Sequence, residues 1–154
     1  MARKKVDAII GFANNDTVAL KNAGIDVINI PILENAQPPL VGVGFGSLAD
    51  KIQPAVYKKF LGAVEKAVKD AVADPKGAVE ITKKYVPSLS ETKAASTALA
   101  VLEQTLLLYQ GDGSFGRQDA ATWNAMEKFL ADNKILKTPV KASEAYTTAV
   151  LEAK

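Results

Sequence analysis

The stretch VDAIIGFANND, residues 6–16, decides how the chain begins. An apolar run through Ile10 leads into a Gly-Phe turn, and three polar side chains follow at Asn14, Asn15 and Asp16. This order is typical of a strand that turns into a helix, whose first N–H groups have no partner inside the helix. A rigid strand that aims such a turn, with amide and carboxyl groups beside it, favours recognition of a small polar ligand.

Working outward from this turn, the sequence predicts a strand-helix-strand unit with parallel pairing. Its first strand, short helix and second strand are expected over residues 5–12, 15–23 and 25–32. Gly24 closes the helix, and residues 34–39 form a turn or hinge that contains two prolines. Residues 40–46 predict a third strand, in which Gly44 lets a ligand approach the backbone closely.

Beyond residue 47 the sequence predicts helices, because apolar side chains recur at helical spacing and Pro or acidic residues mark the starts. The expected helices run from Pro54 through Ala71, from Pro75 until Pro87 stops the helix, from a Ser88/Glu91 capping box to Tyr109, from about Asp119 to Asp132, and from a Ser143 cap to Leu151. The third of these has apolar residues on both sides and should be buried nearly all round. The fold class predicted is therefore α/β, a small mostly parallel sheet of about three strands followed by about five helices.

The composition of the chain excludes several classes of function. The chain has 154 residues, 48% of them hydrophobic and 23% charged, a balance typical of one globular core. Its 19 basic and 17 acidic residues are interspersed, so the basic patch that nucleic acid requires is missing. No apolar run approaches the roughly 20 residues that span a bilayer, so no membrane insertion is expected. The absence of His and Cys excludes Ser-His-Asp triads, thiol nucleophiles and His/Cys zinc sites.

A metal site is not expected either. Asp112 and Asp119 flank a glycine-rich loop and offer carboxylate oxygens, which hard cations prefer. Their spacing does not follow the calcium-loop pattern of alternating oxygens that ends in Glu. The sequence therefore predicts no catalytic residue, no metal and no cofactor.

The polar side chains after the turn allow two interpretations. In the structural one, Asn14 caps the helix, which contributes about 1 kcal/mol, and Asp16 complements the helix dipole. In the functional one, the amides donate to ring nitrogens and Asp16 accepts from an exocyclic amine, as an aminopyrimidine edge requires. Phe12 is then either a core residue or a stacking platform. The candidate ligand-binding residues are Phe12, Asn14, Asn15, Asp16 and Gly44.

A longer series of segments resembles a known family. The segments are residues 6–12, 14–16, 23–27, 73–75 and 85–87, the helix that contains Trp123, and residues 139–147. In their order and spacing they resemble the substrate-binding proteins of ABC transporters in the thiamine-pyrimidine-precursor and aliphatic-sulfonate superfamily. The resemblance implies part of a type II periplasmic-binding fold, two α/β lobes that close on a ligand. The segment looks like the C-terminal half of such proteins.

On this resemblance, residues 1–33 belong to the second lobe, residues 34–39 are the hinge, and residues 40–154 rejoin the first lobe. The implied function is a ligand-binding module for a small nitrogenous, aminopyrimidine-like compound, with a membrane permease as partner and a periplasmic or cell-surface location. Fungal relatives that make the thiamine pyrimidine consume their own active-site histidine. This chain has no histidine, so we expect no enzyme activity.

An alternative remains open: an excised, truncated or engineered half-protein that folds by self-association and has no ligand activity. The first five residues carry the charge of a signal peptide, but no cleavage site follows, so the chain as written is expected to be cytoplasmic. The N-terminal strands of the family are missing, which would leave strand edges exposed. Exposed apolar edges pair with other chains, so we expect a homo-oligomer or a need for the missing half.

Overall fold

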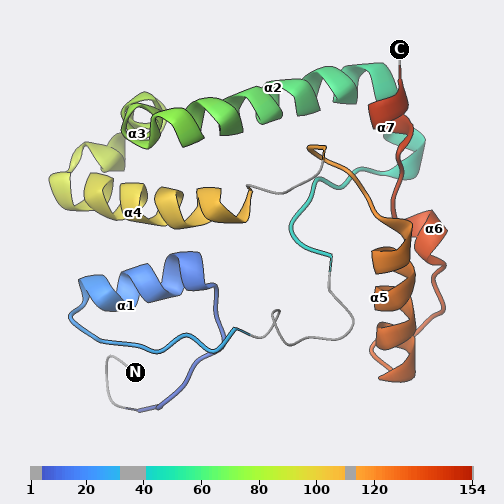
Figure 1. The fold of residues 1–154 in the computed structure, drawn as a ribbon, viewed down its shortest axis with the longest axis horizontal. Helices are drawn as coiled ribbons and strands as arrows, with labels where there is room; N and C mark the ends of the chain where they lie inside the picture. Colours follow the sequence, from blue (N-terminus) through green and yellow to red (C-terminus); the bar gives the residue numbers. More distant parts are fainter. Residues whose placement is uncertain (1–4, 32–40, 110–113, 154) are drawn as a thin grey trace. The chain divides into compact units, whose positions relative to one another are not determined.

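The computed structural model describes residues 5–31, 41–109 and 114–153 (Figure 1). Their elements, in chain order, are η1 (Ala13–Thr17), α1 (Val18–Asn22), η2 (Ala49–Lys51), α2 (Pro54–Ala73), α3 (Pro75–Lys83), η3 (Pro87–Ser90), α4 (Thr92–Leu108), α5 (Ala120–Asp132), α6 (Ala142–Ala145) and α7 (Ala149–Glu152). The element η1 is one turn of π-helix, and η2 and η3 are 3-10 turns. Every element in the described ranges is helical.

The predicted α/β fold is wrong for these residues. None of residues 5–12, 25–31 or 41–46 forms a strand, although each has the apolar pattern of one. A strand obtains its hydrogen bonds from a neighbouring strand, and a sequence pattern specifies the faces of a strand but not its partner. Ile10 and Ile28, which a sheet would bury, are both 93% exposed.

The helical predictions fare better, because a helix satisfies its backbone groups within its own segment. Helix α2 begins at Pro54 and α3 at Pro75, as predicted. The Asp74 carboxylate accepts a hydrogen bond of 2.9 Å from the backbone N–H of Gly77, which caps α3. Gly24 has a φ of 74° and ends the α1 segment in the left-handed conformation that glycine permits.

Three helical details are wrong. The Ser88/Glu91 capping box does not form, because Pro87 starts the 3-10 turn η3 and takes Ser88 into it. Ser143 is not a cap, since it lies inside the short helix α6, which ends three residues before α7 begins. Helix α4 is not buried all round, because Leu108 near its end is 73% exposed.

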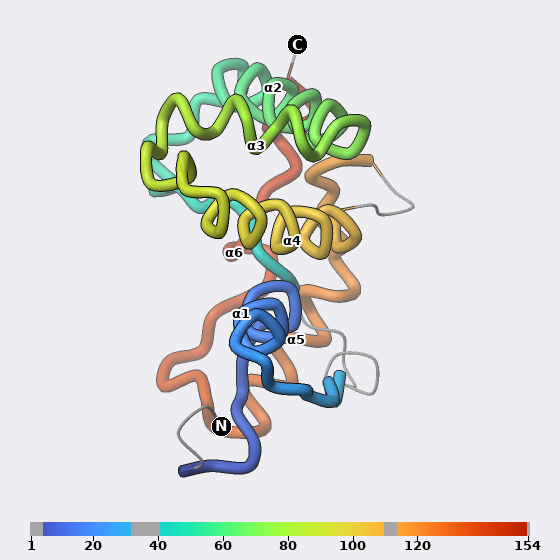
Figure 2. The backbone as a smooth tube through the Cα atoms, turned by 90° about the vertical axis from the view of Figure 1, so that its left-hand side faces the viewer, coloured from blue at the N-terminus to red at the C-terminus, as the bar shows by residue number. Residues whose placement is uncertain are grey.

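The chain divides into two compact units, each with its own small core. The first comprises Met1–Ile30 and Glu65–Asp112. In it, α3, η3 and α4 pack together and α1 lies alongside α4 (Figure 2), burying Val18, Val79 and Leu106. The second comprises Pro31–Val64 and Gly113–Lys154, in which α5 packs on α6 and the buried side chains are Ala142 and Val150.

These units do not test the predicted division at residues 1–33, 34–39 and 40–154, which stays a prediction. The proposed hinge, 34–39, lies outside the described residues. Helix α2 begins in the second unit and ends in the first, because the boundary falls between Val64 and Glu65.

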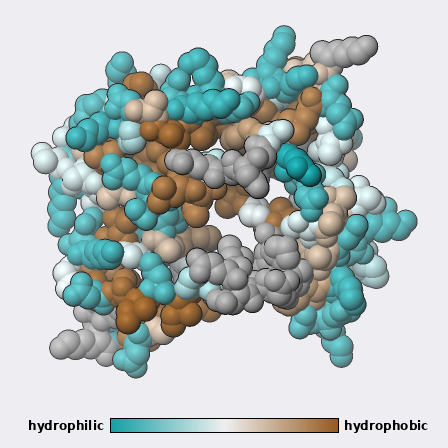
Figure 3. Space-filling view, in the orientation of Figure 1, coloured by the Kyte–Doolittle hydropathy of each residue, from teal (hydrophilic) through white to brown (hydrophobic). Residues whose placement is uncertain are grey.

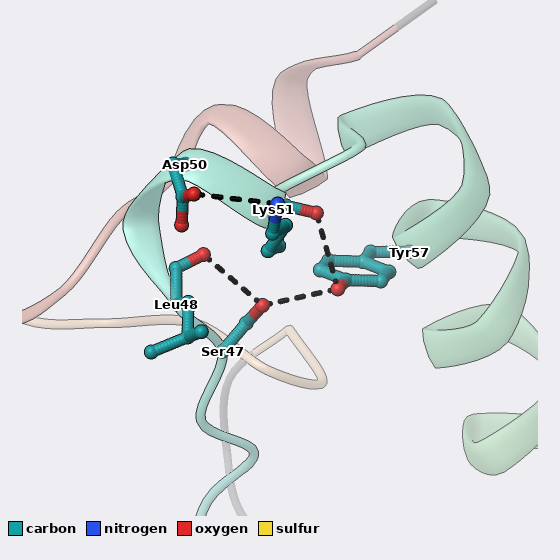
Figure 4. A network of polar contacts seen from close by, with 5 residues as sticks. All are labelled: Ser47, Leu48, Asp50, Lys51 and Tyr57. Atoms are coloured by element: carbon teal, nitrogen blue, oxygen red, sulfur yellow. Dashed lines mark hydrogen bonds and ion pairs between the residues drawn. The ribbon is translucent and has the colours of Figure 1, made fainter.

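In the second unit, a small polar network holds the segment that precedes α2 (Figure 4). The hydroxyls of Ser47 and Tyr57 lie 3.0 Å apart, and the Tyr57 hydroxyl donates to the Lys51 carbonyl at 3.4 Å. The Lys51 ammonium lies 3.5 Å from the Asp50 carboxylate, both largely exposed. All partners of the network lie within residues 47–57, so it organises this local stretch of the chain.

Apolar side chains remain at the surface. In the space-filling view, brown apolar areas interrupt the teal polar surface (Figure 3). The exposed apolar side chains of the described residues include some from the segments predicted as strands, such as Val43 at 89% and Ile30 at 85% exposure. Within the described parts of the chain, no helix has both the length and the apolar character that crossing a bilayer demands.

Candidate functional site

The turn at residues 11–16 is closed by its own hydrogen bonds. The backbone N–H groups of Asn15 and Asp16 both donate to the Phe12 carbonyl, at 3.0 and 2.7 Å. In the opposite direction, the Phe12 N–H donates to the Asp16 carboxylate at 2.6 Å. Phe12 has the extended backbone of a helix N-cap, and Asp16 performs the reciprocal half of a capping box. The turn is therefore fixed by a carboxylate rather than by an Asn14 cap.

Gly11 makes room for this carboxylate. A β-carbon on Gly11 would come into close contact with Oδ2 of Asp16, so one of the two groups would have to move. Glycine at position 11 therefore lets the Asp16 carboxylate reach the Phe12 N–H without a shift of either group. This close approach, and not backbone flexibility, explains the glycine in the turn.

Asn14 links the turn to a helix far away in sequence. Its side-chain amide donates to the Thr105 hydroxyl of α4 at 2.8 Å, and this hydroxyl donates in turn to the Val101 carbonyl at 2.7 Å. Near the other end of α1, the Asn22 amide donates to the Thr97 hydroxyl at 2.9 Å. Two amide-to-hydroxyl bonds therefore dock α1 on one face of α4.

Sequence reasoning missed both threonines. The signal was present, because Thr97 and Thr105 are eight residues apart and so lie on the same face of the helix. Their partners Asn14 and Asn22 have the same spacing on the helix that packs against it. Polar residues with the same spacing on two segments are consistent with pairing. The spacing alone does not show which segments pair, so the pairing had to come from the structure.

The two remaining groups of the turn face outward. Asn15 is exposed, and its side chain makes no hydrogen bond to any other residue that the structure describes. Phe12 is 72% exposed, so it is not a core residue of the described unit. The structure thus separates the predicted residues into a framework, Asn14 and Asp16, and an exposed pair, Phe12 and Asn15.

Gly44, the fifth predicted residue, is described with the second unit, whereas the other four belong to the first. A β-carbon at Gly44 would meet nothing within 4 Å, so its backbone is open to approach. The structure does not bring Gly44 together with the turn in one unit, and its part in ligand binding stays a prediction.

A shallow hollow of about 260 Å³ occurs in the second unit at the start of α5. Its lining residues are Val41, Gly42, Arg117, Gln118, Asp119, Thr122 and Trp123. The Trp123 indole N–H donates to Gln118 Oε1 at 2.7 Å, and the indole stacks on Tyr146 with ring centroids 5.3 Å apart. The stack holds the C-terminal segment on α5, and the bond to Gln118 fixes the indole, which agrees with a packing role for both aromatic residues.

Asp119, weighed above as a metal ligand, caps α5. Its Oδ2 accepts from the Thr122 hydroxyl at 2.7 Å and from the Thr122 N–H at 2.8 Å. These hydrogen bonds, with a smaller effect of the Arg117 charge, lower the pKa of the Asp119 carboxyl below its ordinary value of 3.8. Asp112 lies outside the described residues, and among those described no acidic group of three gathers to hold a metal ion.

Comparison with known proteins bears on the turn directly. A family model described as "NMT1/THI5 like" matches residues 1–78, which include the whole turn at 11–16 and α1. The chain belongs to the NMT1/THI5-like family. This membership agrees with the resemblance to substrate-binding proteins, while the ideas of a C-terminal half and of an ABC transporter stay predictions.

A distant relative of this NMT1/THI5-like chain is also found. It is the riboflavin-binding protein RibY of Chloroflexus aurantiacus, 24% identical over 147 residues, which are 93% of this chain and 42% of the relative. The chain thus spans less than half the length of the curated relative it matches. No solved structure matches the chain.

Proposed function

We propose that this NMT1/THI5-like chain is a ligand-binding portion of a solute-binding protein and that its ligand is a small planar nitrogen heterocycle, aminopyrimidines included. The observation that carries the proposal is the turn at residues 11–16. It lies within the family match, it is fixed by its own hydrogen bonds, and it leaves an aromatic ring and an amide exposed. A fixed turn binds with little ordering cost, because its groups are already in place.

The exposed groups suit such a ligand. The Phe12 ring, 72% exposed, offers a face on which a flat heterocycle can stack. The Asn15 amide offers one acceptor and two donors to the polar edge of the ligand. The relative from Chloroflexus is named for riboflavin, whose ring system includes a pyrimidinedione. Both this name and the predicted aminopyrimidine fall within the class proposed.

The remaining parts of the proposal follow from the same role. Ligand binding would bias an open-closed equilibrium, and a membrane permease at the periplasmic or outer surface would receive the ligand from the closed form. No chemical step is part of it, in keeping with a sequence that has neither His nor Cys.

Titration of the full chain with riboflavin and with 4-amino-5-hydroxymethyl-2-methylpyrimidine tests the proposal, with heat and flavin fluorescence as readouts. We expect saturable binding of at least one compound, and at least about a tenfold loss of affinity in Phe12→Ala, because a stacked aromatic contributes about 1 kcal/mol beyond the area it buries.

Tyr85→Ala is the matched control, since Tyr85 is an equally exposed aromatic in the same unit, at 81%, and lies outside the turn. It should leave the affinity unchanged. Absence of binding by both compounds, or equal losses in the two variants, contradicts the proposal.

A further inference from the structure

The polar groups of the turn at 11–16 are not equally available to a ligand. The Asn15 and Asp16 backbone N–H groups are both bonded to the Phe12 carbonyl, so these two donors are not available to an anion. The Asp16 carboxylate accepts the Phe12 N–H at 2.6 Å and lies over Gly11. Oδ2 of this carboxylate is therefore engaged inside the turn, and moving it to a ligand would give up its hydrogen bond to the Phe12 N–H.

Asn14 is committed as well. Its Nδ2 donates to Thr105, and the Thr105 hydroxyl hydrogen is already directed to the Val101 carbonyl. Thr105 therefore has to act as the acceptor, which fixes the orientation of the Asn14 amide. Of the three polar side chains after the turn, Asn15 alone has no hydrogen bond to a described residue.

We propose that Asn15 selects the ligand edge, and that the edge it selects is uncharged, with one hydrogen-bond donor beside one acceptor, as in a lactam. This inference rests on the proposed function. An asparagine amide presents one acceptor next to one donor and forms two parallel hydrogen bonds with such an edge, as it does with adenine. A carboxylate presents two acceptors and would instead select an edge with two donors, such as a protonated aminopyrimidine.

This assignment makes Asn15, rather than Asp16, the residue that contacts the polar edge of the ligand. Had Asp16 been the free group, the site would favour cationic, two-donor ligands, because a charged pair adds to the hydrogen bonds. With Asp16 bonded inside the turn and Asn15 outside it, the site favours neutral ligands stacked on Phe12. Neutral aminopyrimidines also have a donor next to an acceptor and remain within the class.

The test compares thymine with benzamidine, a planar cation whose amidinium edge has two donors and no acceptor, by calorimetric titration of the full chain. Wild type should prefer thymine by about tenfold, the discrimination that one bidentate contact provides. Asn15→Asp should reverse the preference, and Asn15→Gln, which keeps the amide, should retain it. Asn124→Asp makes the same charge change at an exposed position of α5 and should alter nothing.

The outcomes separate the two proposals. A wild-type preference for benzamidine, or an unchanged preference in Asn15→Asp, overturns the role of Asn15 while the proposed function stands. Failure of thymine, 4-amino-5-hydroxymethyl-2-methylpyrimidine and riboflavin to bind the wild-type chain overturns the proposed function together with this inference. Circular dichroism of each variant confirms that the helices are intact.

Discussion

Helix α4 and the segment 25–31 have similar apolar content, yet the structure treats them differently. Every residue in the interior of α4 is bonded within the helix, and Leu106 is buried at 5% exposure. The segment 25–31 forms no strand, and Ile28 stays 93% exposed. The difference teaches that apolar patterning yields structure on its own only where the segment can satisfy its backbone by itself.

A proline placed in each region gives the largest expected contrast. Ala98→Pro removes a hydrogen bond inside α4 and inserts a ring against the preceding turn, so we expect a loss of about 3 kcal/mol or more. Ile28→Pro should change the free energy of unfolding by no more than about 1 kcal/mol, because no ladder bond is lost. Urea unfolding followed by circular dichroism measures both. An equally large loss in Ile28→Pro would mean that residue 28 belongs to a sheet in solution.

Self-association gives a second contrast between the segment 25–31 and helix α4. We expect the chain to associate through its unpaired apolar segments, because such segments pair with other chains. Ile28→Lys should raise the concentration of half-association about tenfold, since burying one isoleucine contributes about 1.5–3 kcal/mol.

Light scattering over a concentration series follows the association. Leu108→Lys is the control, because Leu108 is also an exposed apolar residue, at 73%, but its backbone already belongs to a helix. Equal effects of the two variants would indicate general apolar adhesion, and a monomer at high concentration would contradict the expectation altogether.

Helix caps give a smaller effect of known sign. Asp74→Ala removes the acceptor of the Gly77 N–H at the start of α3 and should cost about 1 kcal/mol in thermal unfolding. Asp50→Ala is the control, because Asp50 makes only an exposed ion pair with Lys51, and such pairs contribute little. If both losses were the same, the cap would have no specific role.

The smallest effect concerns pH. The folded-state pKa of Asp119 is lowered, so its carboxylate stabilises the folded chain above the unfolded pKa of about 3.8, and this stabilisation is lost as the pH falls through the folded pKa. Asn is an equally good cap that does not titrate. The melting temperature of wild type minus that of Asp119→Asn should therefore decrease as the pH is lowered from about 5. A difference independent of pH would contradict the assignment.

These contrasts also show which structural elements can be predicted from the sequence. The starts of α2, α3 and α5 were predictable because Pro54, Pro75 and Asp119 act on their own helices. The strand predictions failed because their hydrogen bonds require a partner that the pattern does not name.

In the candidate site, too, local features were predictable and long-range contacts were not. A turn after Gly11 and Phe12 was predictable, but the hydrogen-bond partners of its residues were not, and ligand binding there stays a prediction. Asn14 bonds Thr105, 91 residues away, and Asp16 folds back on Phe12 into space that Gly11 leaves open. Only these contacts show which group remains free.

Helix α2 has a consequence for how the chain melts. Eleven of its residues, Pro54–Val64, belong to one unit and nine, Glu65–Ala73, to the other, on a single uninterrupted backbone. Helix propagation is cooperative, so loss of either end frays the hydrogen bonds of the other. Denaturation should therefore proceed as one transition in calorimetry, with matching van't Hoff and calorimetric enthalpies.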